Sequence, residues 1–329
     1  MKVSIIIPIY KVEDEIERCL KSVIEQTYND IELVLVNDKS PDSSFDIAKK
    51  LLHETSHLNL EIHYYEHEKN MGVSVARNTG INNATGDYLF FLDSDDELSS
   101  KDSIRILVGA LEKNRRLDLV VGGFNYINSS NEIVPNNPQY QFFERNSEIF
   151  PFYVKHGILI TPWAKLIRRM FLLENNLLFE EGIYHEDFLW SFQSYRVAEN
   201  IKILSDTVYN YHNRDNSITS TIRNKNVVDL VTVAEKIYSI HQESPEYYPK
   251  ETLVILETTK RTAFRYLSLF NDKKFILGEL LRLKKMRLPL LAIKKTSLLK
   301  FNILMRFPNV FIFFYLRLKK QKIRSFGEK

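Results

Sequence analysis

Apolar and polar residues follow two different rhythms along the first 125 positions of the chain. Short continuous apolar runs, typical of strands that are buried on both faces, alternate with stretches in which apolar residues recur every three or four positions, as on one face of a helix. The expected strands cover residues 2–10, 31–38, 60–67, 88–93 and 117–127. The expected helices between them cover residues 12–26, 40–52, 73–84 and 102–114.

Repeated strand–helix units of this kind predict the α/β class, with a mostly parallel sheet flanked by helices. Ligands of such sheets bind beyond the carboxyl ends of the strands. Aromatic, imino or polar residues follow or close three of the expected strands: Pro8, Tyr10, Asn37, Asp38, Asp93, Asp95 and Asp96. We therefore expect these side chains to border one crevice.

The pattern changes after residue 125. Residues 126–222 are less regular and include a loop-like stretch, whereas residues 226–241 and 251–270 are amphipathic in the helical rhythm. The sequence thus predicts a domain over 1–222, built from a first half 1–125 and a second half 126–222, followed by a helical region over 223–329.

The composition indicates a globular intracellular protein. Of the 329 residues 44% are hydrophobic and 26% are charged, which places the chain among folded proteins. The single cysteine, Cys19, leaves no internal disulfide and no Cys/His cluster for zinc, which fits a reducing compartment such as the cytoplasm. An acidic stretch follows the first apolar run, so we expect no secretion signal and a mature chain that starts near Met1.

The net charge of +3 hides an asymmetry. Residues 281–329 hold 14 Lys and Arg against one acid, a charge of +13, which leaves −10 on residues 1–280. This basic, aromatic tail either lies on an anionic membrane face or packs on the body as a terminal helix. Its longest uninterrupted apolar run, 310–316, is far shorter than the roughly 20 residues that span a bilayer. The acidic body and the lack of a recognition motif argue against nucleic acid.

Three carboxylates within four residues, at 93, 95 and 96, directly follow the apolar run 89–92. Such carboxylates repel one another, so their clustering suggests a divalent cation held by oxygen ligands. For an isolated Asp-rich turn, a solvated turn with a helix cap is the competing interpretation. The strand-end position favours the cation.

Three stretches, 3–44, 73–96 and 162–190, together resemble family 2 glycosyltransferases of the GT-A fold, enzymes that use nucleotide-diphosphate sugars. The resemblance covers roughly residues 1–220. It implies that Pro8 and Tyr10 begin the nucleotide pocket and that Asp38 accepts the N3 proton of uracil, because a carboxylate accepts and cannot donate. It also implies that Arg77 and Asn78 brace the diphosphate and the aspartate loop.

The same resemblance implies a metal site of the Asp-x-Asp type. Asp93 and Asp95 form this pair, with Asp95 as the direct ligand of Mn²⁺ or Mg²⁺, Asp93 also near the nucleotide, and Asp96 beside them. In the later stretch 209–219, His212 would complete the metal shell. Arg214 and Ser217 would contact phosphate.

The resemblance further implies a catalytic pair at 186–187. Asp187 would take the proton of the acceptor hydroxyl, while Glu186 orients the acceptor or serves as the base instead. The competing interpretation of these acids is a helix N-terminus that favours negative charge. Trp163 and Lys165 are expected to line the acceptor side.

The implied function is an inverting, metal-dependent transfer of a sugar from a UDP-sugar to a hydroxyl of a glycan or lipid-linked acceptor. The pathway would be bacterial surface polysaccharide assembly, such as capsule or exopolysaccharide, at the cytoplasmic side of the cell membrane. Two alternatives stay open. A nucleotidyltransferase would need a Gly-rich triphosphate loop near the first strand, and a catalytically silent binding module would release no UDP. No pattern specifies an oligomer.

Overall fold

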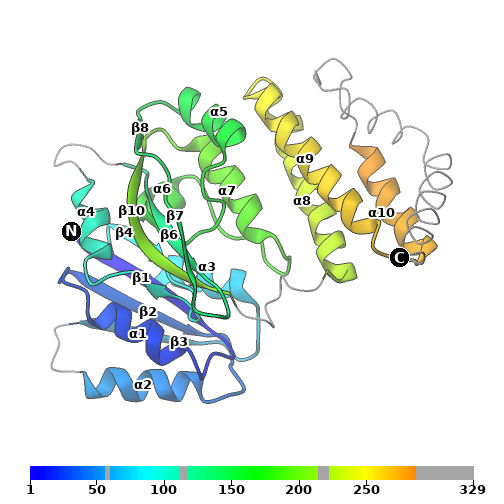
Figure 1. Ribbon diagram of the computed structural model, residues 1–329. Helices are drawn as coiled ribbons and strands as arrows, with labels where there is room; N and C mark the ends of the chain where they lie inside the picture. The colour runs from blue at the N-terminus through cyan, green and yellow to red at the C-terminus, as the bar shows by residue number, and fades with distance from the viewer. Residues whose placement is uncertain (56–59, 112–116, 214–221, 287–329) are drawn as a thin grey trace. The chain divides into compact units, whose positions relative to one another are not determined.

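The computed structural model describes residues 1–55, 60–111, 117–213 and 222–286. The chain divides into two compact units, Met1–Ser220 and Thr221–Lys329. The first unit contains a mixed sheet and its flanking helices, and the second contains helices in its described part (Figure 1). The α/β class that the sequence predicts is confirmed.

The sheet of the first unit has the strand order β3-β2-β1-β4-β9-β6-β10-β5, with β7 paired to β6 and β8 paired to β10. Its strands are β1 Val3–Ile9, β2 Ile31–Asn37, β3 Glu61–Glu66, β4 Tyr88–Phe91, β5 Glu97–Leu98, β6 Leu119–Ile127, β7 Ile133–Asn136, β8 Gln141–Phe143, β9 Lys165–Arg168 and β10 Ile201–His212. The helices are α1 Ile16–Ile24, α2 Ser44–Glu54, α3 Val73–Asn83, α4 Ser103–Gly109, α5 Asn146–His156, α6 Arg169–Glu174 and α7 Glu186–Val197.

Strands β3, β2, β1 and β4 are parallel, so their carboxyl ends meet at one edge of the sheet. Strand β9 runs antiparallel between β4 and β6, so the sheet is mixed at this point, as a mostly parallel sheet allows. All residues of β1 and β2 are buried, because helices cover both faces, while β3 is half exposed at the sheet edge. The core is therefore centred on β1 and β2.

A close approach between α3 and β1 places the residues of α3 at this edge. A Cβ atom at Gly80 would lie 2.3 Å from Cγ2 of Ile6, so only glycine lets the helix pack this near the strand. Arg77 and Asn78 lie about one turn before Gly80, toward the start of α3. The glycine thus sets how deeply these two side chains enter the protein.

The second unit contains α8 Asn224–Glu243, α9 Pro249–Leu267 and α10 Lys273–Lys285. Arg282 of α10 donates hydrogen bonds to Glu235 and Thr232 of α8. None of the helices in the described part of the chain combines the length and the apolar character that crossing a membrane requires. The basic tail beyond residue 286 lies outside the described residues.

Candidate active site

The aspartate loop follows β4 and is fixed through its backbone. The Leu92 amide donates to the carbonyl of Ile6 at 3.0 Å, and the Asp93 amide donates to the hydroxyl of Tyr209 at 3.2 Å. Arg18 of α1 donates to the backbone oxygen of Asp95 at 2.5 Å. These three hydrogen bonds hold the loop backbone, so the Cα atoms of Asp93 and Asp95 have fixed positions. The carboxylates of both residues are partly exposed at the edge of the sheet.

Asp96 has a different environment from the other two acids of the loop. It is 1% exposed, and its carboxylate accepts hydrogen bonds from the Tyr209 hydroxyl at 2.7 Å and from the His212 amide at 2.8 Å. Burial, together with the negative charges of Asp95 and Asp93, raises the pKa of Asp96 well above its usual range. Asp96 therefore supports the loop from within the protein, and its expected place at the metal site stays a prediction.

His212 is expected to complete the metal shell, and this stays a prediction. Its Nε2 atom lies 3.2 Å from a carboxylate oxygen of Glu97, which also accepts from Asn210 at 3.0 Å. Sequence reasoning misses Glu97, although its position directly after the Asp-rich loop is a signal for it. Its partner Asn210 follows only from the β5–β10 pairing.

Arg77 joins the aspartate loop to the start of α7. The guanidinium is buried and donates from Nη2 to Asp93 at 2.8 Å and from Nη1 to Glu186 at 3.0 Å. It also lies 5.3 Å from the ring centre of Phe179. In this structure the terminal nitrogens contact carboxylates, and the expected contact of Arg77 with the diphosphate stays a prediction.

Glu186 and Asp187 occupy the first turn of α7, after His185 in the left-handed conformation with φ 64°. For a residue other than glycine this backbone is strained, and such strain concentrates at functional sites. Burial raises the pKa of both carboxyls, and the positive charge of Arg77 opposes that rise. The structure thus brings Asp93, Glu186 and Asp187 together around one arginine.

Asn78 points away from the rim. Its side-chain amide donates to the carbonyl of Phe179 at 2.9 Å, and its side-chain oxygen accepts from the amide of the same residue at 2.8 Å. Both hydrogen bonds are buried. In this structure the hydrogen-bonding groups of Asn78 fasten the segment that lies beneath Arg77, and its expected role in bracing the diphosphate and the aspartate loop stays a prediction.

Asp38 is 3% exposed, and four donors surround its carboxylate. Oδ1 accepts from the His67 ring at 2.7 Å and from the Met71 amide at 2.7 Å. Oδ2 accepts from the Asn70 side chain at 3.0 Å and from the Gly72 amide at 2.7 Å. A carboxylate has about four acceptor sites, so the loop 67–72 fills them. In this arrangement Asp38 organises the loop that opens α3, and its expected contact with a base stays a prediction.

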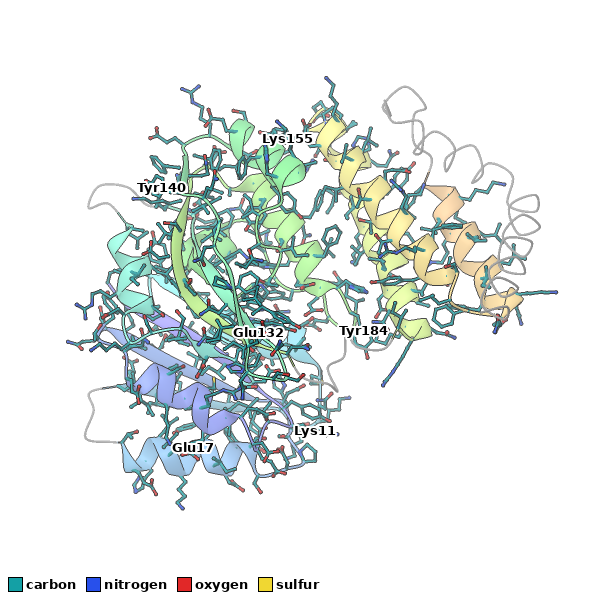
Figure 2. The ribbon with its side chains drawn as sticks, viewed as in Figure 1. Lys11, Glu17, Glu132, Tyr140, Lys155 and Tyr184 are labelled. Atoms are coloured by element: carbon teal, nitrogen blue, oxygen red, sulfur yellow. The ribbon has the colours of Figure 1, made fainter. Side chains whose placement is uncertain are left out.

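Pro8 and Tyr10 lie on and just beyond the last residues of β1. Pro8 is a buried strand residue paired with Val36, and its expected place at the start of the nucleotide pocket stays a prediction. Tyr10 is 40% exposed, and the ammonium of Lys11, labelled in Figure 2, lies 5.4 Å from its ring centre. An exposed aromatic ring at a strand's carboxyl end offers a flat surface for a base to stack on.

The two residues expected on the acceptor side are both buried. Trp163 is 6% exposed and stacks on Tyr209 with ring centres 4.6 Å apart. Lys165 is 0% exposed within β9. This burial does not favour a place on the acceptor side, which stays a prediction for both residues. Arg214 and Ser217, expected to contact phosphate, lie outside the described residues.

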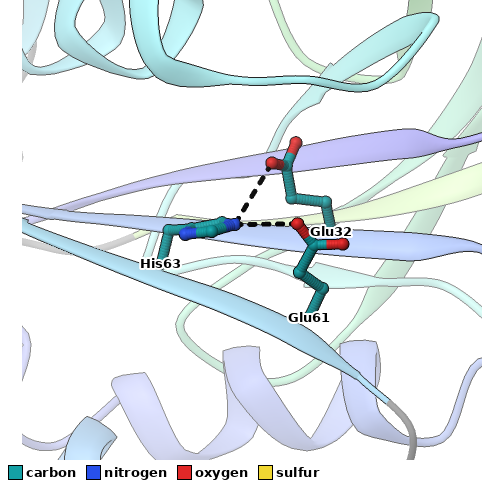
Figure 3. Close-up of side chains that lie close together, drawn as sticks. All are labelled: Glu32, Glu61 and His63. Carbon is teal, nitrogen blue, oxygen red and sulfur yellow. Dashed lines mark hydrogen bonds and ion pairs between the residues drawn. The ribbon is translucent and has the colours of Figure 1, made fainter.

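A second cluster of possible metal ligands lies near the opposite, amino ends of the strands (Figure 3). Its members are Glu32, Glu61 and His63, whose ligand atoms lie within 4.8 Å of one another. The fully buried Glu32 carboxylate already accepts from the Ser4 hydroxyl and from two donors of Thr85. The ammonium of Lys2 lies 2.6 Å from Glu61 and supplies positive charge. This cluster fastens the strands and is separate from the aspartate loop.

The residues at the rim fit a hard divalent cation. Asp93 and Asp95 offer carboxylate oxygens in a partly exposed position, as Mg²⁺ and Mn²⁺ prefer. The Arg77 contact occupies Oδ1 of Asp93 and leaves Oδ2 without a recorded partner among the described residues. Asp93 and Asp95 are thus the two residues that the geometry makes suitable for an ion.

Comparison with known proteins identifies relatives of the chain. Residues 4–175 match the model of glycosyl transferase family 2. Over 226 residues, 66% of the chain, it is 38% identical to the uncharacterized glycosyltransferase EpsJ of Bacillus subtilis, and it is 35% identical over 228 residues, also 66% of the chain, to the glycosyltransferase GlyA of Streptococcus pneumoniae. These matches cover 62% and 31% of the two relatives, so the chain corresponds to only part of each.

Among solved structures, residues 1–349 of Staphylococcus aureus TarS in complex with UDP-GlcNAc superpose with a TM-score of 0.69. The alignment covers 99% of the chain and 92% of TarS 1–349, at 22% sequence identity. At this identity the likeness establishes the fold. The GT-A architecture that the sequence motifs imply is confirmed.

Proposed function

Because the chain belongs to glycosyl transferase family 2, we propose that it transfers a sugar from a UDP-sugar, with inversion, to a hydroxyl of a glycan or lipid-linked acceptor. The observation that carries this proposal is the bridge from Asp93 through Arg77 to Glu186, which ties the rim acids to the first turn of α7. The UDP-GlcNAc bound in the TarS structure supports UDP as the donor nucleotide. We assign this activity to residues 1–222 and leave the helical region 223–329 outside the chemistry.

The acceptor oxygen attacks the anomeric carbon from the face opposite the departing diphosphate. A new carbon–oxygen bond forms, the bond to the diphosphate breaks, and its electron pair leaves with UDP. Asp187 takes the hydroxyl proton. Of the two acids, Glu186 is the less suited to this step, because the Arg77 contact at 3.0 Å holds one of its oxygens. Glu186 instead keeps Arg77, and through it Asp93, in position.

We place a divalent cation, Mn²⁺ or Mg²⁺, on Asp93 and Asp95. When bound, it neutralises charge that develops on the departing diphosphate. The chain supplies the fixed geometry: Arg77 holds the Asp93 side chain, and Arg18 holds the Asp95 backbone. Such preorganisation matters because charge stabilisation is effective only if the groups need not move during the reaction.

We place the reaction in the assembly of a bacterial surface polysaccharide, as both relatives named above are bacterial glycosyltransferases. Contact with an anionic membrane face through the basic tail remains part of the proposal and is supported by the charge of +13 on residues 281–329. Sedimentation with vesicles that contain anionic lipid tests it. Equal sedimentation of the full chain and of a chain ending at residue 286 would contradict it.

The experiment that tests the activity is a screen for UDP release across UDP-sugars, with and without Mn²⁺. The wild type should release UDP from one donor, and Asp187→Asn should lose about a thousandfold in rate, as expected for removal of a general base together with its charge. The matched control is Asp206→Asn, which changes an exposed aspartate of β10. Absence of UDP release from every donor and acceptor would favour the silent binding module.

A further inference from the structure

Lys165 is a buried cation that the proposed chemistry does not yet use. It is 0% exposed and follows Ala164, whose left-handed backbone with φ 56° is strained for a residue other than glycine. Its ammonium donates a hydrogen bond to the carbonyl of Thr161. Within the described residues no carboxylate is recorded at ion-pair distance from it. A buried charge without a close partner is expensive, which calls for a functional reason.

Three consecutive carbonyls in segment 159–161 show where this ammonium lies. The first accepts from the hydroxyl of Tyr195 at 3.0 Å, the second from the hydroxyl of Ser191 at 2.6 Å, and the third from Lys165. Tyr195 and Ser191 belong to α7, whereas Lys165 belongs to β9. The segment is thus fastened along α7, and the lysine continues that row of donors.

The donors of α7 in this row lie on the same helix face as Asp187, the proposed base. Tyr195, Ser191 and Asp187 are spaced by four residues, so they share one face of α7. Tyr195 and Ser191 donate to the first and second carbonyls of the segment. Asp187 is the next residue on this face of α7 toward the start of the helix, and Lys165 donates to the third carbonyl at that same end of the segment. The geometry therefore brings the ammonium and the carboxylate into the same buried region.

The electrostatics of the two groups agree with this placement. Burial lowers the pKa of Lys165 to about 7, and the negative charge of Asp187 opposes that fall. Burial raises the pKa of Asp187, and the positive charges of Arg77 and Lys165 oppose the rise, while Asp93 adds to it. The terminal nitrogens of Arg77 are held by Asp93 and Glu186. Arg77 has the larger effect on Asp187, and Lys165 is a second cation, among the described residues, whose charge acts on this carboxylate.

We propose that Lys165 is the counter-cation of Asp187, a positioning residue that keeps this carboxylate ionised and oriented to take the acceptor proton. The inference rests on the proposed function insofar as Asp187 is the base. Other groups face Asp187 from the elements around it. They are Arg77 of α3, Asp93 after β4, Glu186 in the same turn of α7 and Tyr153 of α5, whose buried hydroxyl has no recorded partner among the described residues.

The first test is the pH profile of kcat/KM for Lys165→Met, which keeps the length of the side chain and removes the charge. Its acid limb should move upward by about one unit or more, because an opposite charge a few ångströms away shifts a carboxyl pKa by that amount. The KM for the donor and the affinity for Mn²⁺ should be unchanged. Lys165→Arg, which retains the charge, should restore the wild-type limb. A profile of Lys165→Met that coincides with the wild type overturns the proposal.

Lys260→Met is the matched control. Lys260 lies in α9 of the second unit, is 2% exposed, donates to the carbonyl of Met286 at 2.9 Å, and has a pKa that burial lowers to about 8. It is therefore an equally buried lysine with the same kind of partner. Its replacement should change the thermal stability and leave the pH profile as in the wild type. An equal shift of the acid limb in both variants would mean that the effect of Lys165→Met comes from general destabilisation, which contradicts the proposal.

A second measurement does not depend on turnover. The titration of Lys165, followed by NMR of ¹³C-labelled lysine and assigned with Lys165→Met, should move to lower pH in Asp187→Asn, because the opposing charge is gone. The lysine signal of Lys260 should not move. If the Lys165 titration shifts but the wild type transfers no sugar, the pairing of Lys165 with Asp187 stands and the proposed function is rejected. If the wild type is active but the Lys165 titration does not change, the pairing is rejected and the proposed function stands.

Discussion

The guanidinium of Arg77 lies 3.0 Å from the carboxylate of Glu186, although 109 residues separate them in the chain. Helix α3 supplies the arginine and α7 supplies the acid. The same guanidinium holds Asp93 at 2.8 Å. One buried cation thus links the loop proposed to hold the metal with the helix turn proposed to hold the base.

Replacement of Arg77 by Met should lower the free energy of unfolding by about 3 kcal/mol, because it leaves the mostly buried Glu186 carboxylate and the partly exposed Asp93 carboxylate without their partner. Chemical denaturation without nucleotide measures this. Arg168→Met is a useful comparison, since Arg168 pairs with Asp118 at 2.8 Å in a more exposed position and should cost less. Equal losses of unfolding free energy in the two variants would show that Arg77 stabilises the fold no more than an ordinary ion-paired arginine.

Asp95 and Asp96 should respond differently to the same change. We expect Asp95→Asn to weaken binding of Mn²⁺ and UDP by about a hundredfold or more, and Asp96→Asn by about tenfold at most, since Asp96 acts through the loop backbone. Isothermal calorimetry of both variants checks this. If the Asp96 variant loses as much affinity as the Asp95 variant, Asp96 is a ligand after all.

Asp38→Asn separates two roles of this carboxylate. If it organises the loop 67–72, the variant loses about 2–4 kcal/mol of folding free energy in the absence of nucleotide, because buried backbone donors lose their acceptor. Thermal or urea unfolding of the apo protein gives this value. If Asp38→Asn is as stable as the wild type but no longer binds UDP, the role of Asp38 is base recognition. Tyr10→Ala is the control, because it should weaken UDP binding and leave stability unchanged.

The pH dependence of the reaction follows from the raised pKa of Asp187. The base must be ionised, so kcat/KM falls as the pH drops through this raised pKa. The acid limb therefore lies above the ordinary aspartate value of about 3.9. Initial rates at saturating Mn²⁺ across a series of buffers measure it. A rate that stays constant down to that ordinary value would mean that Asp187 is not the base.

Glu32 should affect stability and not catalysis. Burial opposes its ionisation, but hydrogen bonds from Ser4 and Thr85 outweigh it and lower the pKa of Glu32. Its contribution is complete above the unfolded pKa of about 4.3 and is lost as the pH falls through the lower folded value. Glu32→Gln should therefore be less stable than the wild type at neutral pH, with the difference shrinking in acid. A chelator that destabilised the wild type but not this variant would instead indicate a metal at the Glu32–Glu61–His63 cluster.

Much of the fold could be predicted from local patterns. The apolar runs that form β1 and β2, and the helical rhythm of α1 and α3, are properties of neighbouring residues, and a buried run has few other stable arrangements. The antiparallel entry of β9 between β4 and β6 could not be predicted this way, because pairing between distant strands leaves no trace in the rhythm of either.

The sequence names candidates for the site but not their contacts. Motif positions single out Asp93, Arg77 and Asp187, but they do not say which carboxylate shares which cation. Lys165 shows the difference: the family resemblance implies a residue on the acceptor side, whereas the structure buries this lysine, a residue type that is mostly exposed, directly after the left-handed backbone of Ala164.

The sequence by itself determined the α/β class, the order of strands and helices along most of the first unit, and the gathering of acids after β4, since each depends on short-range periodicity. Only the tertiary structure decided that Asp96 faces inward, that Asp38 and Asn78 are used by the chain's own backbone, and that Arg77 connects α7 to the loop. The physical reason is that hydrogen bonds and burial depend on which atoms from distant segments come within a few ångströms, and this is set by packing.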